Sequence, residues 1–391
     1  MTEKLFYEDS HMINFSAIVV ACEKVGDYYE AVLDRTAFFP EGGGQDADTG
    51  VIDDCNVLDV QEKGGIIYHT VDNPLEVGKE VKGSIEWDVR FSRMQQHSGE
   101  HIVSGIVHAL YGYDNVGFHM GQDATTIDFN GKLTKEQLAD IERKANEAVT
   151  ANLDVQVEFP SREELKNIKY RSKIEIEGQV RLVTVPGHDA CACCAPHVKK
   201  TGEIGAIKFV GMQNYKGGVR VSLLCGFRAI EDYEEKSERM KMLSVLLSAP
   251  ESEVISEVNR LKEELSECKI QIAKLEQKLL ECRADELAGG QELLVVFDGE
   301  LQGEGPRELV NLLMDRGIGI GAVFTGEEDV GYRYVIGSRT MDVRAFAKLL
   351  SERFQGKGGG KAEMVQGSLH APKQEIQQAM EMCFNTHKME E

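Results

Sequence analysis

The spacing of hydrophobic residues between positions 258 and 282 constrains this chain more than any other feature. Such residues recur there at alternating intervals of three and four, at Val258, Leu261, Leu265, Cys268, Ile272, Leu275, Leu279 and Cys282. This a/d repeat, flanked by many Glu and Lys residues, is typical of a coiled coil. At about 1.5 Å per residue the segment would extend roughly 36 Å. It predicts a coiled-coil arm or an antiparallel helical hairpin; two shorter helices packed on a globular core are the alternative.

The arm divides a chain of 391 residues, which at about 150 residues per domain has room for two or three domains. We divide the sequence into residues 1–90, 91–230, 231–288 and 289–391, and the third segment is the helical arm. Hydrophobic residues make up 42% and charged residues 28% of the chain. These proportions exclude a mostly disordered protein.

Residues 1–90 alternate between β-rich runs and short turns. Strands are predicted at residues 17–22 and 28–33, and again at 57–60 and 66–70, with a glycine-containing turn inside each pair. Because no long helical repeat interrupts them, the expected fold is a small barrel or sandwich. We predict a β-barrel-like domain.

Helical periodicity begins near Ser92, where His97 and His101 share one face of the predicted helix. A second helix is predicted over residues 135–150, with Thr134 as its N-cap. Strands, helix and loops are mixed in the rest of this segment. It is therefore predicted to complete an α+β domain.

Beyond the arm, strands and helices alternate. Predicted strands at 293–297 and 322–325 flank a predicted helix at 306–316, which is the order of a βαβ unit in an open α/β sheet. The glycine-rich stretch 356–361 is predicted to be a loop, and a terminal helix is predicted from about Pro372. The segment is expected to be a C-terminal α/β domain.

The net charge of −22 argues against diffuse attraction to nucleic acid, because phosphate binding depends on Lys and Arg. Residues 161–229 reverse the sign, with 12 basic and 6 acidic side chains. That segment is either the footprint of a polyanion or a solvated face with chance clustering.

No stretch approaches the roughly 20 apolar residues of a membrane helix, and the first residues lack the features of a signal peptide. We therefore expect a cytoplasmic protein. Its nine cysteines are then expected to be reduced, which makes them candidates for metal binding.

Two short clusters carry metal-ligand chemistry. His97 and His101 are four residues apart on the predicted helix, and Cys193 and His197 have the same separation in a segment with a proline. Three imidazoles and one thiolate form a normal tetrahedral ligand set for zinc. The alternatives are a polar helix face, and a separate cysteine site at Cys191, Cys193 and Cys194. Finding both pairs in one reduced chain favours a single shared zinc.

A third cluster is the run Gly42-Gly43-Gly44-Gln45. Three consecutive glycines suggest a place where a ligand approaches the main chain closely, and Gln45 would add a hydrogen bond. A flexible hairpin connection is the alternative.

The clusters together resemble the editing domain of alanyl-tRNA synthetases and the free-standing editing proteins of the AlaX type. The matching residues, in order, are Asp34 to Thr36, Pro40 to Gln45, Gln96 to His101, Cys193 to His197 and Val198 to Ile204. The glycine-rich Gly356 to Gly360 and Gln366-Gly367 resemble the C-terminal domain of those synthetases. They are also similar to the nucleic-acid-binding domain attached to DHH phosphoesterases. The resemblance covers nearly the whole chain.

The resemblance implies a trans-editing hydrolase that deacylates alanine tRNA mischarged with serine, or with glycine. It implies one zinc held by His97, His101, Cys193 and His197. Gln45, Gly43 and Gly44 would hold the terminal adenosine or the ester, and Thr36 would sense the serine hydroxyl. Candidate tRNA contacts are Lys199, Lys200, Lys357 and Lys361. The C-terminal domain would bind tRNA or form a homodimer, and the arm is a second route to a dimer.

One departure concerns the second metal motif. The family motif usually reads Cys-Gly-Gly-Thr-His, whereas Cys194-Ala195-Pro196 occupies the middle here. The ligand types are kept, but the hydroxyl and the glycine flexibility are lost. Two other functions therefore stay open: a non-catalytic RNA-binding protein with structural zinc, and a zinc hydrolase of another aminoacyl ester.

Overall fold

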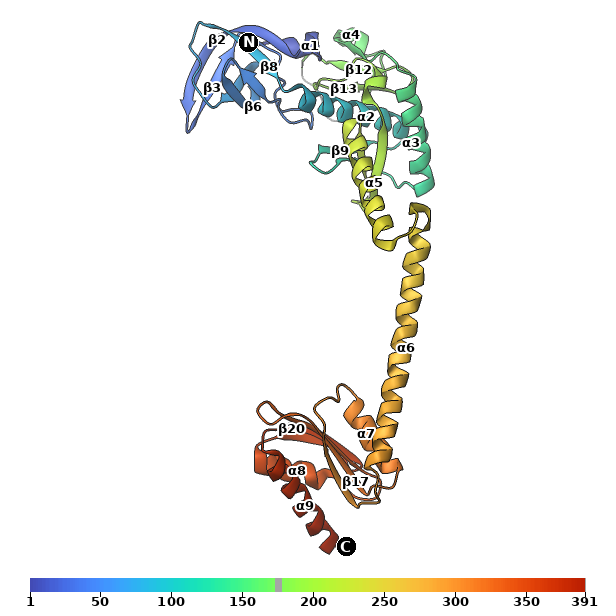
Figure 1. Cartoon of the computed structure of the whole chain (residues 1–391). Coiled ribbons are helices and arrows are strands. Elements are labelled where there is room, and N and C mark those ends of the chain that lie inside the picture. The colour runs from blue at the N-terminus through green and yellow to red at the C-terminus, as the bar shows by residue number, and fades with distance from the viewer. Residues whose placement is uncertain (173–177, 391) are drawn as a thin grey trace. The chain divides into compact units, whose positions relative to one another are not determined.

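The computed structural model describes residues 1–172 and 178–390 (Figure 1). By its contacts the chain divides into two compact units, Met1–Met242 and Leu243–Glu391, and each is described by itself. Within the described ranges no helix is both long and apolar enough to cross a membrane.

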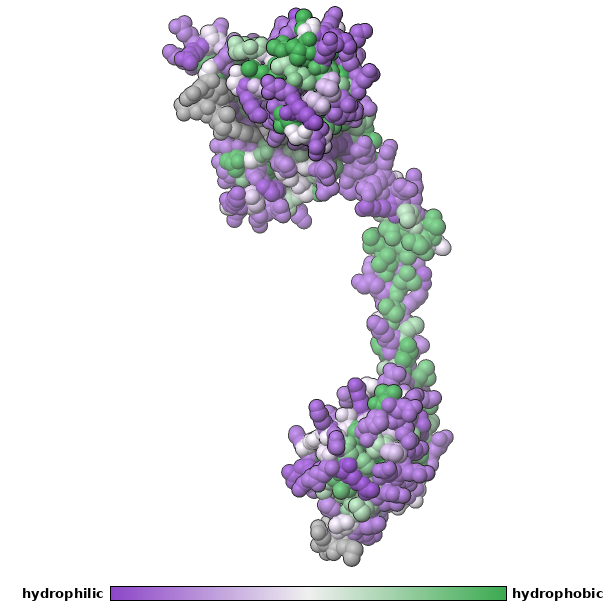
Figure 2. Space-filling model, turned by 90° about the vertical axis from the view of Figure 1, so that its left-hand side faces the viewer, coloured by the Kyte–Doolittle hydropathy of each residue, from purple (hydrophilic) through white to green (hydrophobic). Residues whose placement is uncertain are grey.

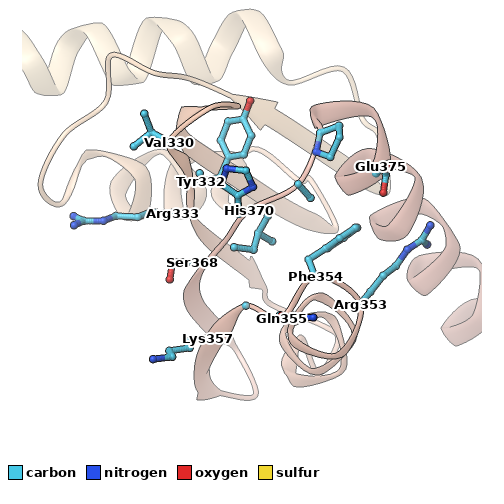
Figure 3. Close-up of a pocket in the computed structure, with 15 residues that line it drawn as sticks. Val330, Tyr332, Arg333, Arg353, Phe354, Gln355, Lys357, Ser368, His370 and Glu375 are labelled. Carbon is cyan, nitrogen blue, oxygen red and sulfur yellow. The ribbon is translucent and has the colours of Figure 1, made fainter.

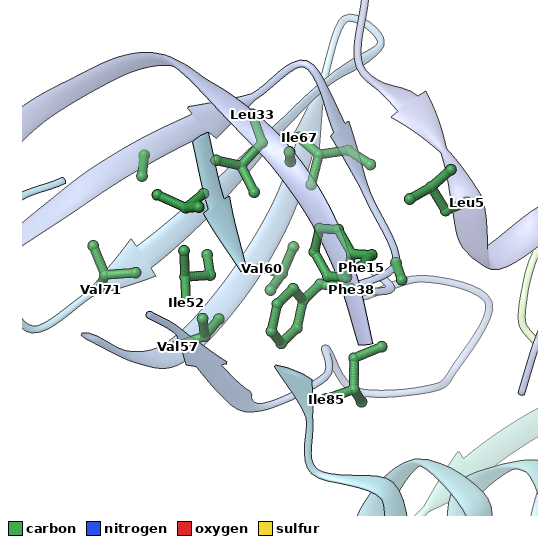
Figure 4. Close-up of a cluster of buried hydrophobic side chains, with 14 of the residues drawn as sticks. Leu5, Phe15, Leu33, Phe38, Ile52, Val57, Val60, Ile67, Val71 and Ile85 are labelled. Atoms are coloured by element: carbon green, nitrogen blue, oxygen red, sulfur yellow. The ribbon is translucent and has the colours of Figure 1, made fainter. Parts of the chain in front are cut away.

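The first unit begins with a β-barrel. Its strands close in the order β2-β3-β7-β6-β5-β8, and they are β2 (Asn14–Val25), β3 (Tyr28–Leu33), β7 (Ile66–Val71), β6 (Cys55–Lys63), β5 (Gly50–Ile52) and β8 (Glu80–Ile85). Side chains alternate between the interior and the solvent, and Phe15, Phe38, Val60 and Ile67 are among those that fill the interior (Figure 4). The short α1 (Leu5–Glu8) and the parallel pair β1 (Glu3–Lys4) and β4 (Arg35–Thr36) lie outside the closed barrel.

The rest of the first unit surrounds one long helix, α2 (Trp87–Tyr111). An antiparallel sheet has the order β14-β15-β10-β9, and a smaller sheet has the order β11-β12-β13. Their strands are β14 (Ile207–Tyr215), β15 (Gly218–Cys225), β10 (Thr125–Phe129), β9 (Asn115–Met120), β11 (Gln156–Glu158), β12 (Leu182–Val185) and β13 (Asp189–Ala192). The remaining helical elements are α3 (Lys135–Thr150), α4 (Arg162–Leu165), η1 (Thr201–Ile204) and the first part of α5 (Phe227–Leu247).

The helix predicted over residues 135–150 is confirmed as α3. Thr134 caps it in a capping box, because its side chain accepts from the Gln137 amide while the Gln137 side chain returns to Thr134. The helix predicted from Ser92 begins earlier, at Trp87. Its N-cap Glu86 forms no side-chain cap, so the capping signal that marks α3 is missing at this start.

The helix α2 contains two glycines at positions where other elements approach it closely. A Cβ at Gly99 would lie 2.3 Å from Cys225 Sγ, and one at Gly105 would lie 2.2 Å from the His188 carbonyl oxygen. A glycine inside a helix costs about 0.5–1 kcal/mol. Here it allows β15 and β13 to pack directly on the helix that carries His97 and His101.

The second unit contains α6 (Val254–Leu287), preceded by η2 (Glu251–Glu253). The heptad segment is one continuous helix, so two shorter helices are excluded for residues 254–287. The buried residues of α6 are Val254 at its start and Leu280 and Ala284 near its end, where the latter two pack in one cluster with residues of α7. Along the predicted seam, Val258, Leu261, Leu265, Ile272, Leu275 and Leu279 are 40% to 65% exposed. Figure 2 shows hydrophobic surface along this helix. Pairing of the seam stays a prediction.

The second unit also contains a sheet of order β16-β17-β18-β20-β19. Its strands are β16 (Leu293–Phe297), β17 (Ile320–Glu327), β18 (Gly331–Ser338), β20 (Met364–Leu369) and β19 (Lys357–Lys361). The helices are α7 (Gly305–Asp315), α8 (Arg344–Phe354) and α9 (Lys373–Glu390). β16 and β17 are parallel, as the βαβ prediction requires, and the other neighbouring strands are antiparallel. Residues of α8 and α9 pack on one face, and those of α6 and α7 on the other.

The prediction of a loop at residues 356–361 is wrong, because Lys357–Lys361 forms the edge strand β19. Tyr334 explains Gly358 within that stretch, and also Gly367 on the neighbouring strand β20. A Cβ at Gly358 would lie 2.1 Å from the Tyr334 hydroxyl, and one at Gly367 would lie 2.6 Å from it. The glycines make room for a ring inside the fold, and packing overrides their low strand propensity.

Candidate metal centre

Four side chains from two distant segments meet in the first unit. One ligand atom each from His97, His101, Cys193 and His197 lies within 4.8 Å of all the others. The Cys193 sulfur is 3.6 Å from His97 Nε2 and 3.4 Å from His197 Nε2. The imidazoles of α2 thus face the loop after β13. This donor set suits zinc, which prefers nitrogen and sulfur ligands in a tetrahedral arrangement.

A different acceptor lies behind each histidine, at its Nδ1. The Gln45 Oε1 atom is 3.1 Å from His97 Nδ1, and the Ser98 hydroxyl is 3.0 Å from His197 Nδ1. An Asp189 carboxylate oxygen is 3.3 Å from His101 Nδ1. With the Nδ1–H groups of His97 and His197 directed to these acceptors, their Nε2 atoms are left for a metal. The His101 Nδ1 atom lies near the Asp189 carboxylate but does not have hydrogen-bonding geometry to it.

The electrostatics favour the metal-binding form of the sulfur. Burial raises the pKa of the Cys193 thiol, but the charges of His97 and His197 and a hydrogen bond from His101 outweigh it and hold that pKa well below its usual range. Burial lowers the pKa of His101, yet its contacts with Asp189 and Cys193 raise it well above the ordinary value. The thiolate is the form in which cysteine binds zinc.

The neighbouring cysteines differ from Cys193. Burial raises the pKa of Cys191, and it raises the pKa of Cys194 to about 11. Cys191 also belongs to a second group with His101 and Asp189 whose atoms lie close enough to hold a metal. Both Asp189 oxygens, however, contact the Arg171 guanidinium. A cation so close opposes binding of a second one, which favours the first group.

The glycine run forms a tight turn beside these ligands. Gly42 and Gln45 exchange backbone hydrogen bonds, and the two residues between them have φ angles of +63° and +82°. Two central residues with positive φ require glycine, so the turn itself explains Gly43 and Gly44. A Cβ at Gly44 would also lie 2.7 Å from the ring of Phe118, which packs on His97.

A buried ion pair fixes this turn relative to α2. Arg90 Nε is 2.8 Å from Asp48 Oδ1, and the Phe39 amide donates to the same carboxylate at 2.6 Å. Both charged side chains are 1% exposed. Because Arg90 lies on α2 and Asp48 follows Gln45 closely, this pair sets the position of Gln45 beside His97.

Three of the ligands, His97, His101 and Cys193, line a pocket of about 700 Å³. Its lining includes Gly43, Glu100, Tyr7, Phe159, Gln179 and Arg181. Sequence reasoning missed Arg181. This side chain donates from Nη1 to the carbonyl oxygens of Cys193 and Ala195 at 2.9 and 2.8 Å, and so shapes the metal-ligand loop. Its guanidinium lies 5.0 Å from the centre of the Tyr7 ring. No motif spacing links it to Cys193.

Thr36 does not line that pocket. It is fully buried in the barrel, its hydroxyl is 2.9 Å from His69 Nε2, and it accepts from the Phe38 amide. Burial lowers the pKa of His69 to about 4, so the ring is neutral. Its Nδ1 donates to the Ala31 carbonyl oxygen, which leaves Nε2 to accept the Thr36 proton.

The candidate tRNA contacts fall into two classes. Lys199 forms an ion pair with Asp9 at 2.8 Å, and Lys200 forms one with Asp154 at 2.7 Å. The basic segment thus meets acidic partners in its own unit. By contrast, in the part of the chain that the structure describes, Lys357 and Lys361 have no ion pair or side-chain hydrogen bond.

Lys357 belongs to a row of polar side chains across three strands. Arg333 on β18 pairs with Ser368 on β20, and Ser368 pairs with Lys357 on β19. All three are exposed and point to the same side (Figure 3). They line two neighbouring pockets of about 920 and 850 Å³ in the C-terminal unit. Arg333, like Lys357, has no ion pair within the described residues.

Gly359 leaves the backbone of β19 uncovered on this face of the sheet. A Cβ there would meet nothing within 4 Å, and its φ is not in the left-handed region. The fold therefore does not require glycine at this position, unlike at Gly358. An uncovered backbone beside Arg333 and Lys357 allows a phosphate group to approach the strand closely.

Two family models match parts of the chain. Residues 2–89 match the model of tRNA synthetases class II (A), and residues 180–222 match that of the threonyl and alanyl tRNA synthetase second additional domain. The first match covers the barrel, and the second covers the loop with Cys193 and His197. His97 and His101 lie outside both.

Curated relatives match most of the chain. It is 32% identical over 289 residues to the alanyl-tRNA editing protein AlaX-L of Pyrococcus horikoshii, covering 70% of this chain and 72% of the relative. It is 27% identical over 418 aligned positions to the alanyl-tRNA editing protein Aarsd1 of Rattus norvegicus, covering 99% of each. It is 32% identical to the alanine–tRNA ligase of Ignicoccus hospitalis but spans only 31% of that protein.

Proposed function

Because this chain belongs to the family of alanyl-tRNA editing proteins, we propose that it is a trans-acting editing hydrolase. It deacylates alanine tRNA that carries serine, with the glycyl ester as a second substrate. The observation that carries the proposal is the convergence of three histidine nitrogens and one cysteine sulfur beside a pocket that three of these residues line.

The four ligands fit zinc by donor type and by the orientation of their rings, so His97, His101, Cys193 and His197 would hold one ion. When bound, zinc supplies a Lewis acid that activates water or orients the ester. The remaining chemistry belongs to side chains of this protein, beginning with Gln45.

The oxygen and the nitrogen of the Gln45 side-chain amide differ in their hydrogen bonding. Its Oε1 atom faces His97, whereas its Nε2 atom is buried and has no acceptor among the described residues. An amide with unsatisfied hydrogens beside a pocket is suited to donate to the ester carbonyl oxygen, where negative charge develops during hydrolysis. Gly43, which lines the pocket, and Gly44 bring the backbone of the turn close to the same ligand.

Discrimination between amino acids has a physical basis. A synthetase pocket for alanine distinguishes serine, with one added hydroxyl, by only about 1–3 kcal/mol. A second site that hydrogen-bonds this hydroxyl rejects alanine more strongly, because alanine leaves its polar groups unpaired. Thr36 stays our candidate for this discrimination. Because it is fully buried outside the pocket and its hydroxyl already pairs with His69 and the Phe38 amide, it would act through neighbouring residues and not by direct contact with the serine hydroxyl.

The C-terminal unit provides the second contact with tRNA in this proposal. Arg333, Lys357 and Lys361 have no acidic partners among the described residues, and Arg333 and Lys357 flank Ser368 on an exposed part of the sheet. Free cations of this kind bind phosphate without first breaking an ion pair. The paired Lys199 and Lys200 contribute less. Two weak contacts on one chain raise the overall affinity.

A second copy of the chain is the proposed partner of the α6 seam. Glu257 and Lys262, like Glu264 and Lys269, are five residues apart. That separation pairs opposite charges across a parallel two-stranded coiled coil. The exposed apolar seam supports the same arrangement.

One observation favours a different function. Four protein ligands can close the coordination sphere of zinc, as in structural sites, and the protein would then bind RNA without hydrolysis. The adjoining pocket and the free Gln45 amide favour catalysis instead. A hydrolase of another aminoacyl ester would use the same residues.

Deacylation of seryl-, glycyl- and alanyl-tRNA, all prepared on alanine tRNA, tests these functions. We expect rapid hydrolysis of the seryl ester, slower hydrolysis of the glycyl ester and little of the alanyl ester. Zinc removal by a chelator should abolish the activity, and zinc addition should restore it. Binding without hydrolysis of any ester would identify the structural-zinc function. Seryl-tRNA assembled on a serine tRNA controls for the tRNA body.

A further inference from the structure

Asp189 lies directly behind one of the four ligands. One of its carboxylate oxygens is 3.3 Å from His101 Nδ1. Its side chain is 2% exposed. The other two histidines have a neutral amide and a neutral hydroxyl in the equivalent place. Among the described acceptors behind these rings, only Asp189 carries a negative charge.

A second residue holds Asp189 in place. Arg171 Nε is 2.7 Å from Asp189 Oδ1, and Arg171 Nη2 is 2.8 Å from Oδ2. The backbone of Arg171 is itself fixed, because its amide donates to Ala190 and its carbonyl accepts from Ala192. A bidentate pair of this kind compensates the buried carboxylate and fixes its orientation.

Gly105 makes the approach possible. It follows His101 by four residues on α2, and a Cβ there would lie 2.8 Å from Asp189 Cβ as well as 2.2 Å from the His188 carbonyl oxygen. Any larger residue would push β13 away from the helix. Glycine is unfavourable in a helix interior, so its presence here is explained by the contact between Asp189 and His101.

We propose that Asp189, oriented by Arg171, is a positioning residue that fixes the His101 ring with Nε2 toward the metal and strengthens metal binding there. The inference rests on the proposed zinc site. The negative charge of Asp189, 3.3 Å from Nδ1, favours a proton on that nitrogen and therefore the tautomer that leaves Nε2 unprotonated. It does not coordinate the ion, because Arg171 engages both of its oxygens.

The test measures zinc affinity of the full chain by competition with a chromophoric chelator. We expect Asp189→Asn to weaken zinc roughly 10- to 100-fold, the usual effect of losing a carboxylate behind a ligating histidine. The matched control is Asp128→Asn, because Asp128 forms the same bidentate pair with Arg220 at 2.6 and 2.8 Å in the same unit. This control should bind zinc within about twofold of the wild type.

Cobalt substitution adds a readout that a merely structural role would not move. In Asp189→Asn the ligand-field bands of bound cobalt should shift, whereas the sulfur charge-transfer band from Cys193 should stay. Arg171→Lys keeps the positive charge but loses the bidentate hydrogen bonding of the guanidinium, so it should show a smaller loss of zinc affinity. If Asp189→Asn does not fold, this variant tests the proposal in its place. Wild-type affinity and spectrum in both variants would overturn the proposal. Loss of metal from Cys191→Ala would also overturn the proposal, because it would show that the ion is held by His101, Asp189 and Cys191 instead. A wild-type chain without zinc affinity would instead refute the proposed metal site.

Discussion

The metal centre and the sheet face of the C-terminal unit handle charge in opposite ways. At the metal centre the histidines have acceptors behind them, and a buried ion pair fixes the neighbouring turn. On the sheet face, Arg333 and Lys357 are exposed and have no ion pairs in the described chain. Chemistry requires groups that are held before the substrate arrives. Binding of a polyanion requires cations that remain accessible.

Removal of a metal ligand should have the largest effect. His101→Ala should reduce bound zinc from one per chain to less than about a tenth and abolish hydrolysis of seryl-tRNA. Cys191→Ala should retain full zinc, because burial keeps its thiol protonated. Elemental analysis after dialysis measures both. Full zinc in the His101 variant would contradict the ligand assignment.

Gln45 allows the two roles of one side chain to be separated. Gln45→Ala should lower the rate of seryl-tRNA hydrolysis by roughly 10²–10³-fold, as loss of a donor to the developing oxyanion does, with zinc retained. Gln45→Glu keeps an acceptor for His97 but removes the Nε2 donor. If Gln45→Glu hydrolyses the ester at the wild-type rate, the amide serves only to orient His97.

On the sheet face, the double variant Arg333→Ala, Lys357→Ala should raise the KM for full-length tRNA by roughly tenfold and leave kcat unchanged. A short acceptor-stem mimic should be affected little, because it does not reach this face. The salt dependence of binding should weaken by about two phosphate contacts. Lys199→Ala is the control and should change KM less, because Lys199 already pairs with Asp9. Equal effects of both substitutions would remove the distinction between free and paired cations.

The smallest effect is expected at Thr36. Thr36→Val should reduce the preference for seryl over alanyl ester by a few-fold, because it removes a hydroxyl and keeps the volume. It should also lower the free energy of unfolding by about 1–3 kcal/mol, since His69 Nε2 and the Phe38 amide lose their buried partner. Kinetics with both esters and thermal unfolding measure the two effects. Lower stability with unchanged selectivity would place the discriminating contact elsewhere.

The sequence predicts the residues whose chemistry shows in local spacing. His97 with His101, and Cys193 with His197, were found because each pair is separated by four residues, and the structure brings them together. Asp189, Arg171 and Arg181 were missed. Their contacts with His101 and Cys193 depend on how β12, β13 and the segment before them pack on α2, and no short motif records that packing.

The fold shows the same division. The capped helix α3 follows from local signals. The strand β19 does not, because its Gly358 is required by packing against Tyr334, which is distant in the sequence. The heptad repeat predicts the helix α6 but not what covers its seam. Interactions between distant residues, or between chains, leave little trace in a local pattern.

The uneven packing of α6 has a consequence for amide hydrogen exchange. Near Leu280 and Ala284 the helix is buried against α7, and Arg283 forms an ion pair with Asp298 at 2.7 Å. From Val258 to Leu279 its hydrogen bonds depend on the helix alone, and a helix without tertiary packing is only marginally stable in water. Deuterium should therefore enter this stretch long before it enters the anchored end. If a second copy covers the seam, the difference should shrink as the protein concentration rises, which makes isotope uptake along one helix a measure of self-association.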